Sequence, residues 1–219
     1  GRTAGVYIGI PFCPTRCLYC SFASNQASTE AMDRYLEALL KEVKAVGAEF
    51  HSRDIRPESV YIGGGTPTSL SAFSLERLLS CVTESFDLSE IREFCVEAGR
   101  PDTITPEKLK VIRRYGADRV SINPQSMNDI TLERIGRSHT VDEIYRAFEM
   151  VRESGIPHVN TDIIAGLPGE DYGMFLHTLN SVIALQPDNI TVHTLAVKRA
   201  SRLKDQNENY HYENAGGVG

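Results

Sequence analysis

Three cysteines in one short stretch are the residues of this chain with the most evident chemistry. Three residues separate Cys13 from Cys17 and two separate Cys17 from Cys20, directly after the strand-like run 6–10. Thiolates hold iron–sulfur clusters, and a [4Fe–4S] cube needs one ligand for each iron. This loop supplies three thiolates, so one iron would keep an open position, as a catalytic metal site requires. The spacing therefore favours a [4Fe–4S] cluster with one free iron.

Two other uses of these cysteines stay open from the spacing alone. A zinc site needs a fourth ligand and usually has two pairs of ligands, and the nearest histidine, His51, is far along the chain. A disulfide would leave one cysteine of the three unpaired. The rest of the chain has to decide between these alternatives and the cluster.

Composition and charge limit the class of protein. The net charge is −6 and the pI about 5.6, which argues against a nucleic-acid-binding protein because such proteins carry a basic face. No apolar run approaches transmembrane length and no signal-peptide pattern is found, so we expect no membrane insertion. Five cysteines, three of them clustered, fit a reducing compartment, and we expect a cytoplasmic location.

Apolar periodicity and turn residues predict an α/β fold in which six strands alternate with helices. Thr29 and Thr105 are expected as N-caps, and Pro57 is expected just before the second strand. The strands are predicted at 6–10, 59–62, 93–98, 119–123, 159–165 and 189–195. The helices are predicted at 29–46, 74–85, 106–115, 129–135, 141–153 and 172–185.

This alternation implies parallel strands joined by right-handed crossovers. Two architectures satisfy it, an open doubly wound sheet and a curved partial barrel, and the pattern does not choose between them. In both, functional groups lie at the carboxyl ends of the strands. The glycine run at 63–68, G-G-G-T-P-T, follows the second strand and lets the backbone approach a ligand closely. A tight strand–helix turn or a phosphate loop is the alternative, but no Gly-Lys-Ser/Thr follows.

The motif Cys13-x-x-x-Cys17-x-x-Cys20 resembles that of the radical S-adenosylmethionine (radical SAM) superfamily. Within it, the G-G-G-T-P stretch and nearly the whole chain resemble the oxygen-independent coproporphyrinogen III oxidases, or coproporphyrinogen dehydrogenases. The resemblance implies a partial barrel of (β/α)6 type with parallel strands and the helices outside. It also implies a [4Fe–4S] cluster on the three cysteines, whose open iron binds the amino and carboxylate groups of S-adenosylmethionine. The reduced cluster then cleaves the sulfonium to give a 5′-deoxyadenosyl radical.

The same resemblance implies a set of cofactor-binding residues. Glu97 and the glycine run match residues that meet the methionine amino group, and Arg137 matches the residue that grips its carboxylate. Gln125 and Asp162 offer acceptors for ribose hydroxyls. Each residue taken singly is as readily a helix cap, an ion-pair partner or a loop residue, but all converge on strand ends. The full expected set is Tyr7, Tyr19, Gly64, Gly65, Thr66, Glu97, Gln125, Arg137, Asp162, Gly166 and Ala196.

A reaction is implied as well. In the family that the chain resembles, the radical abstracts a hydrogen from a propionate of coproporphyrinogen III, carbon dioxide leaves and a vinyl group forms. An acceptor takes the remaining electron, and the product is protoporphyrinogen IX. The cluster needs an electron donor such as flavodoxin or ferredoxin. We therefore expect an oxidoreductase of heme biosynthesis in which the protein orients the cofactor and excludes water and oxygen.

One position departs from the best-known coproporphyrinogen dehydrogenases. They carry a fourth cysteine two residues after the last ligand, where this chain has Phe22 in C-S-F. The C-S-F form resembles the heme-chaperone branch of the family, so heme binding without dehydrogenase activity is the alternative function. A tRNA-modifying radical SAM enzyme is disfavoured by the net charge of −6.

The remaining expectations concern domain organisation and less prominent residues. Residues 1–200 are expected to form the core domain, with the cluster loop at 11–24, and residues 201–219 a polar tail that begins a missing C-terminal region. A small basic cluster at 198–202 either attracts anionic propionates or is a solvated helix face. Cys81 and Cys95 are expected to be buried. His193 stands near the end of the last strand, where it either faces the pocket or has a core or loop role, and the core or loop role is favoured.

Overall fold

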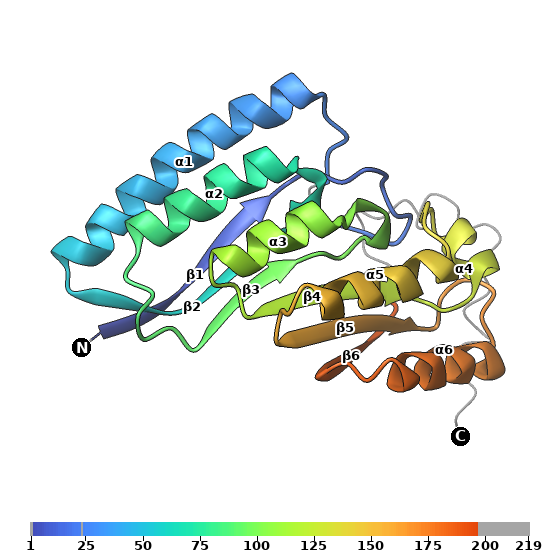
Figure 1. Cartoon of the computed structure of the whole chain (residues 1–219). Helices are drawn as coiled ribbons and strands as arrows, with labels where there is room; N and C mark the ends of the chain where they lie inside the picture. Colours follow the sequence, from blue (N-terminus) through green and yellow to red (C-terminus); the bar gives the residue numbers. More distant parts are fainter. Residues whose placement is uncertain (1, 23, 197–219) are drawn as a thin grey trace.

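The computed structural model describes residues 2–22 and 24–196, in which strands and helices alternate as predicted (Figure 1). The basic cluster at 198–202 and the tail at 201–219 lie outside the described residues. No helix of the described part is long and apolar enough to cross a membrane. The strands are β1 (Arg2–Ile10), β2 (Ile55–Gly64), β3 (Glu93–Glu97), β4 (Arg119–Gln125), β5 (His158–Ala165) and β6 (Asn189–Thr194). The helices are α1 (Thr29–Ser52), α2 (Ala72–Ser85), α3 (Pro106–Arg114), α4 (Asp129–Arg134), α5 (Val141–Glu153) and α6 (Tyr172–Ala184), and the 3-10 turns are η1 (Pro67–Ser69) and η2 (Pro101–Thr103).

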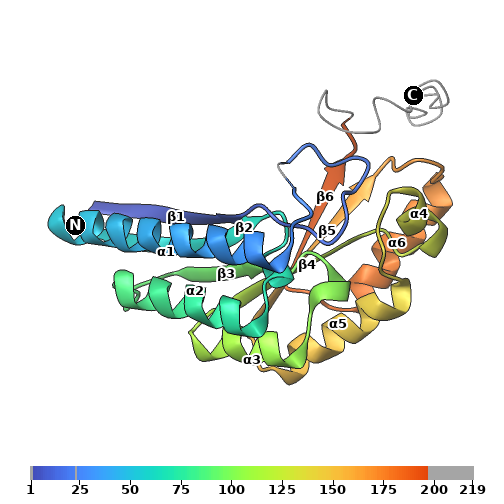
Figure 2. The same cartoon turned by 90° about the horizontal axis from the view of Figure 1, so that it is seen from above.

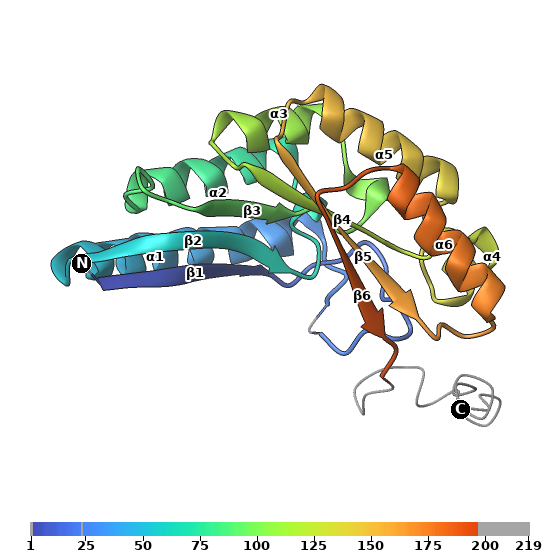
Figure 3. The ribbon, with the colours of Figure 1, turned by 90° about the horizontal axis from the view of Figure 1, so that it is seen from below.

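The six strands form one parallel sheet in the order β1-β2-β3-β4-β5-β6. A doubly wound sheet reverses its strand order, which puts helices on both faces. In the sequential order seen here every right-handed crossover falls on the same face. The sheet curves, with its helices on the convex side, as the two views along its edge show (Figures 2 and 3). The partial barrel is therefore confirmed over the doubly wound alternative.

Alternation along the strands separates an apolar face from a polar one. In β3, Phe94 and Val96 are buried in the core shared with the helices, whereas Glu97 points to the concave side and lines a pocket. Complete burial of an apolar side chain such as that of Phe94 or Val96 stabilises the fold by about 1.5–3 kcal/mol. The largest fully buried side chains on the helix side include Leu36, Leu75, Leu78, Leu79, Leu109, Ile112 and Phe148.

Helix starts follow the predicted capping chemistry, with one correction. Thr105 caps α3 and Pro106 is its first residue, as predicted. In α1 the capping residue is Ser28, whose Oγ accepts from the amide of Ala31, and Thr29 is already helical. The predicted cap was therefore wrong by one residue, because either hydroxyl can satisfy the free amides of the first turn.

The first two strands are longer than predicted, and Pro57 lies inside β2 instead of before it. The register between β1 and β2 shifts between Ala4 and Gly5, next to the position paired with Pro57. Pairing of β2 with β3 begins only at Ser59. The missing N–H of Pro57 therefore falls where the ladder is irregular, which is where a strand tolerates proline.

Candidate active site

The cysteine loop, residues 11–24, follows β1 and is attached at both ends and in the middle. Cys13 N donates to Asn25 O at 3.1 Å, and Asn25 N donates to Pro11 O at 2.8 Å. Leu18 N donates to Ile135 O at 2.9 Å, directly after α4. These bonds fix the path of residues 11–22 across the carboxyl ends of the strands, although those residues contain no helix or strand.

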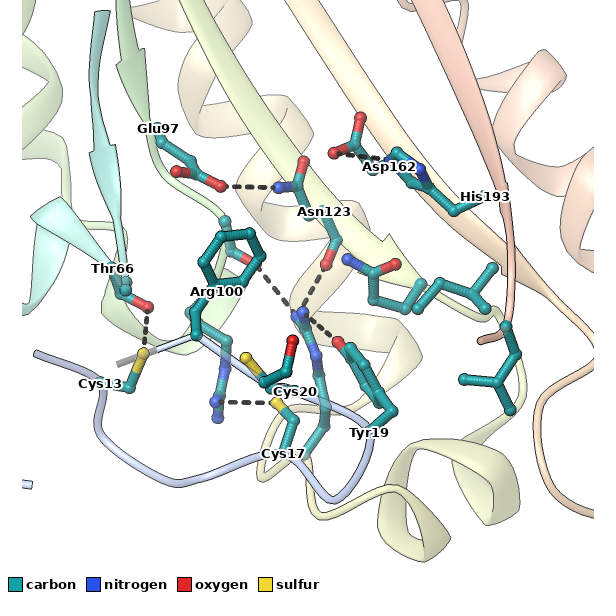
Figure 4. A pocket seen from close by; sticks show the side chains of 18 of the residues that line it. Cys13, Cys17, Tyr19, Cys20, Thr66, Glu97, Arg100, Asn123, Asp162 and His193 are labelled. Carbon is teal, nitrogen blue, oxygen red and sulfur yellow. Dashed lines mark hydrogen bonds and ion pairs between the residues drawn. The ribbon is translucent and has the colours of Figure 1, made fainter. Parts of the chain in front are cut away.

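The three thiols of this loop are free and line one pocket (Figure 4). Cys17 is buried, and Cys13 and Cys20 are half-buried. Cys13 Sγ lies 3.3 Å from Thr66 Oγ1, and Cys17 Sγ lies 3.8 Å from Arg100 Nη1. Burial raises the pKa of the Cys13 and Cys20 thiols, so a thiolate at either position needs a cationic partner such as a metal.

The donor set fits an iron–sulfur cluster better than a single metal ion. Within residues 2–22 and 24–196, no three His, Cys, Asp or Glu side chains are arranged to hold one ion, which disfavours zinc. The ligands of a [4Fe–4S] cube bind different irons, so their sulfur atoms need not converge on one point. Three free thiols around one pocket are the ligand set that such a cube with an open iron requires.

The pocket has a volume of about 310 Å³ and lies at the carboxyl ends of the strands. Its wall is built from the cysteine loop, the ends of β2 to β6 and the loop after α4 (Figure 4). Most of the predicted site residues therefore converge here from segments far apart in the sequence. Those in the wall are Cys13, Cys17, Tyr19, Cys20, Gly64, Gly65, Thr66, Glu97, Gln125, Arg137, Asp162 and Ala196.

Two predicted residues, Tyr7 and Gly166, are not brought into the pocket wall. Tyr7 lies three residues before the end of β1 at Ile10, and a strand advances about 3.3 Å per residue, so its Cα lies roughly 10 Å from that end. Its ring is 64% exposed and stacks on Tyr61 with 5.8 Å between the ring centres. Gly166 has a φ of 81° and turns the chain after β5, which explains the glycine without a ligand contact.

The glycine run brings the end of β2 against the cysteine loop. A Cβ on Gly65 would lie 2.6 Å from Phe12 O and 3.0 Å from Cys13 Sγ. Gly64 has a φ of 111°, and Thr66 N donates to Phe12 O at 2.7 Å. These glycines therefore allow the end of β2 to pack closely against the cysteine loop, in addition to any approach to a ligand.

Glu97 stands at the end of β3 and accepts a hydrogen bond from Asn123 Nδ2 at 3.3 Å. Burial, and to a lesser degree the charge of Asp162, raises the pKa of Glu97 to about 7. A cation in the pocket would stabilise the carboxylate form. Asn123 was not singled out from the sequence, although it occupies the inward position two residues before Gln125.

Arg137 is buried and joins three segments of the pocket wall. Its Nη1 donates to Gly99 O at 3.0 Å and to Asn123 O at 2.7 Å, and its Nη2 donates to Tyr19 Oη at 3.0 Å. Such bonds fix the ends of β3 and β4 to the cysteine loop. Arg137 therefore has a structural task in addition to any contact with a ligand.

Three buried polar atoms of the wall have no hydrogen-bond partner within the described residues: Asn123 Oδ1, Gln125 Oε1 and Arg137 Nε. Buried polar atoms without a partner are rare in native proteins and call for an explanation. Gln125 also has a φ of 69°, a strained value for a residue other than glycine, and such strain gathers at ligand sites. A polar ligand that both donates and accepts hydrogen bonds fits this wall.

His193 lies in β6 and in the pocket wall, with 56% of its side chain exposed and its Nε2 3.6 Å from Asp162 Oδ2. Of the two positions considered from the sequence, the structure therefore shows the one facing the pocket, and the favoured core or loop role was wrong. His193 pairs with Ile164, which is two residues after Asp162 and therefore points to the same face.

Comparisons with known proteins agree with the fold and with the cysteine loop. Residues 7–182 match the family model of the radical SAM superfamily. The oxygen-independent coproporphyrinogen-III oxidase-like protein HemZ of Bacillus subtilis is 44% identical over 208 residues, which are 94% of this chain and 42% of HemZ. The heme chaperone HemW of Bacillus subtilis is 36% identical over 193 residues, which are 88% of this chain and 50% of HemW.

The structure of the coproporphyrinogen III oxidase HemN from Escherichia coli is similar at a TM-score of 0.80 with 26% identity, over 94% of this chain and 51% of HemN. The chain thus spans about half the length of the relatives it matches. The family match covers most of the sequence, including the cysteine loop and strands β2 to β5, and ends before β6. This chain belongs to the radical SAM superfamily.

Proposed function

We propose that this chain is the radical SAM core of an enzyme like the oxygen-independent coproporphyrinogen III oxidases, which converts propionate side chains of coproporphyrinogen III to vinyl groups. The observation that carries the proposal is the gathering of the cysteines and the predicted SAM-binding residues in one pocket wall. A [4Fe–4S] cluster with S-adenosylmethionine would supply a 5′-deoxyadenosyl radical there. The relatives named as coproporphyrinogen III oxidases or oxidase-like proteins support the substrate class.

Several residues of the wall have a task in this proposal. Cys13, Cys17 and Cys20 would hold three irons of a [4Fe–4S] cluster and would leave the fourth without a protein ligand. The carboxylate of Glu97 accepts from the ammonium group of the cofactor, an interaction that favours its ionised form despite burial. Asp162 accepts from a ribose hydroxyl.

The three unpaired atoms in the wall support the same assignment. Gln125 Oε1 and Asn123 Oδ1 can accept hydrogen bonds from a ligand, and Arg137 Nε can donate one to its carboxylate. The Nη atoms of Arg137 already donate to Gly99, Asn123 and Tyr19, so the guanidinium reaches the ligand with a fixed orientation. A pre-oriented donor binds a ligand at a lower entropic cost.

Heme binding without dehydrogenase activity is the second candidate. Phe22 lies in the pocket wall and is 67% exposed. It stands where the best-known dehydrogenases carry a further cysteine, and an exposed aromatic ring offers an apolar surface for a flat macrocycle. The similarity to HemW, which is named a heme chaperone, supports this alternative.

One anaerobic experiment separates the two candidates. The cluster-loaded protein is given a reductant and S-adenosylmethionine, and then either coproporphyrinogen III or heme. An oxidase forms 5′-deoxyadenosine and the vinyl product together, and Cys17→Ser abolishes both. Stoichiometric heme binding with no vinyl product from coproporphyrinogen III would favour the chaperone and overturn the proposed reaction.

A further inference from the structure

Arg100 is a buried arginine that the resemblance did not single out, and it contacts the cysteine loop directly. The residue is 2% exposed and stands three positions after Glu97, immediately before η2. Its Nη2 donates to Thr15 Oγ1 at 2.9 Å, and its Nη1 donates to Thr15 O at 3.4 Å. The same Nη1 lies 3.8 Å from Cys17 Sγ, as Figure 4 shows. One guanidinium therefore holds both the backbone and a thiol of the loop.

The other side of this guanidinium is fixed by two further loops. Nε donates to Asp102 Oδ1 at 3.2 Å, and Nη2 donates to Ser138 Oγ at 2.8 Å. Ser138 Oγ in turn donates to Asp102 Oδ2 at 2.9 Å. Arg100 thus ties the cysteine loop to the end of β3 and to the loop after α4, with its donors directed at fixed acceptors.

The residues around Arg100 determine whether Asp102 and His139 are charged. Burial by itself would raise the pKa of Asp102, but the neighbouring His139 ring, whose Nδ1 lies 3.6 Å from Asp102 Oδ1, the charge of Arg100 and the hydroxyl of Ser138 together hold that pKa well below its usual range. Burial lowers the pKa of His139, which favours a neutral imidazole at pH 7. The Arg100 guanidinium therefore places a cationic group next to Cys17.

A cation and an N–H donor beside a ligating sulfur raise the reduction potential of an iron–sulfur cluster. The reduction potential of such a cluster depends on net charge, on hydrogen bonds to its sulfurs and on solvent exposure. A reduced cluster carries one more negative charge than the oxidised one, so a buried cation stabilises the reduced form more. The ion pair of Arg114 with Glu76, by contrast, is at the surface, with 68% of the Arg114 side chain exposed, and Arg114 does not line the pocket.

We propose that Arg100 is a positioning residue that holds Thr15 and Cys17 in place and raises the reduction potential of the cluster. The inference rests on the proposed function in one respect, that Cys13, Cys17 and Cys20 hold a [4Fe–4S] cluster. It goes beyond that function because it assigns control of electron uptake to Arg100, which lines the same pocket but has no task in the proposed binding of S-adenosylmethionine or substrate. It does not depend on which macrocycle the protein binds.

The test is a redox titration of the cluster-loaded protein, followed by EPR, with no substrate added. Arg100→Gln keeps a hydrogen-bond donor but removes the charge. Arg100→Lys keeps the charge but removes the planar guanidinium, whose N–H groups donate to several acceptors at once. In Arg100→Gln we expect the ratio of reduced to oxidised cluster at a fixed potential to fall about tenfold, a shift of about 59 mV for a one-electron couple. The reduction potential of Arg100→Lys should lie between those of Arg100→Gln and the wild type. Arg114 is at the surface, and the potential of Arg114→Gln should match that of the wild type.

Wild-type potentials in both Arg100 variants, with the cluster fully loaded, would overturn the inference and leave the proposed function intact. If Arg100→Gln fails to fold or to retain iron, Arg100→Met, which also removes the charge but keeps a long unbranched side chain, takes its place, and a wild-type potential there again overturns the inference. A wild-type protein that takes up no [4Fe–4S] cluster would overturn both the inference and the proposed function. The two failures are therefore distinguishable.

Discussion

Arg137 Nη2 donates to Tyr19 Oη at 3.0 Å although the two residues are 118 positions apart in the chain. Tyr19 belongs to the cysteine loop, and Arg137 to the loop after α4. The other nitrogen, Nη1, donates to the backbone of Gly99 and Asn123, at the ends of two neighbouring strands. The proposed cluster site and the proposed cofactor site are therefore built as one unit, and a change in one should be felt in the other.

The cysteine loop provides the first prediction. Cys17→Ala should abolish formation of the [4Fe–4S] cluster on anaerobic reconstitution, because a cube cannot be held stably with a ligand missing. Cys81→Ala is the matched control, since Cys81 is buried on α2 and outside the pocket. Iron and sulfide content and the visible absorbance measure the outcome. An intact cluster in Cys17→Ala would remove the basis for assigning this loop as the ligand set.

The ribose contact proposed for Asp162 provides the second prediction. Asp162→Ala should weaken S-adenosylmethionine binding by roughly 1.5–3 kcal/mol, the usual range for a hydrogen bond to a charged group. The iron content should not change, because Asp162 is not one of the proposed cluster ligands. Calorimetry on the cluster-loaded protein measures the affinity, with Asp33→Ala on the exposed side of α1 as control. Equal affinities in wild type and Asp162→Ala would refute the ribose contact.

Local rules predicted an α/β fold with parallel strands, whereas the resemblance to the radical SAM family supplied the choice of the partial barrel and most of the predicted wall residues. Alternating strands and helices imply a parallel sheet, and its carboxyl ends gather the residues that follow each strand. Tyr7 was expected in the wall because the resemblance matches it to an aromatic residue that lines the cofactor, six positions before the first cysteine. That distance includes three strand residues after it, which carry the ring away from the strand ends.

Neither the contacts of Arg100 nor the structural task of Arg137 could be predicted from the sequence. Both depend on loops that meet only in the folded chain, such as the approach of Thr15 to Arg100. A glycine run likewise predicts a close approach of backbone, but it does not say that the neighbour of Gly65 is Cys13. Local patterns identify which residues are unusual, and tertiary packing decides which of them touch.

Glu97 provides a prediction about pH and stability. Its pKa of about 7 in the folded chain lies above the ordinary value of 4.5. The folded state therefore binds more protons than the unfolded chain between these values, and the free energy of unfolding falls as pH rises through about 4.5 to 7. Glu97→Gln removes this pH-dependent loss of stability. The free energy of unfolding of the variant, taken relative to that of the wild type, should therefore increase by on the order of 2 kcal/mol from pH 5 to pH 8.

Urea unfolding of the cluster-free protein under reducing conditions measures this difference at both pH values. Glu42→Gln, at an exposed position of α1, is the control and should show no such change with pH. A Glu97→Gln variant whose stability relative to wild type is the same at pH 5 and pH 8 would show that Glu97 titrates normally.

Gly65 provides a prediction about packing. A Cβ at this position would lie 2.6 Å from Phe12 O, closer than a Cβ approaches backbone in real structures. Gly65→Ala should therefore displace the start of the cysteine loop and lower the amount of iron retained per chain. Gly9→Ala is the control, because its Cβ would meet only the ring of Tyr7, at 3.6 Å. Equal iron retention in both variants would show that the loop does not depend on this close packing.

The most direct measurement of the central claim is the formation of 5′-deoxyadenosine by the cluster-loaded, reduced protein supplied with S-adenosylmethionine. The account predicts its formation by the wild type, its loss in Cys17→Ala and a lower yield in Asp162→Ala at low cofactor concentration. The assay needs no porphyrin substrate, so it tests the pocket independently of the choice between oxidase and chaperone. A wild-type protein that holds a reduced [4Fe–4S] cluster and forms no 5′-deoxyadenosine would contradict the account.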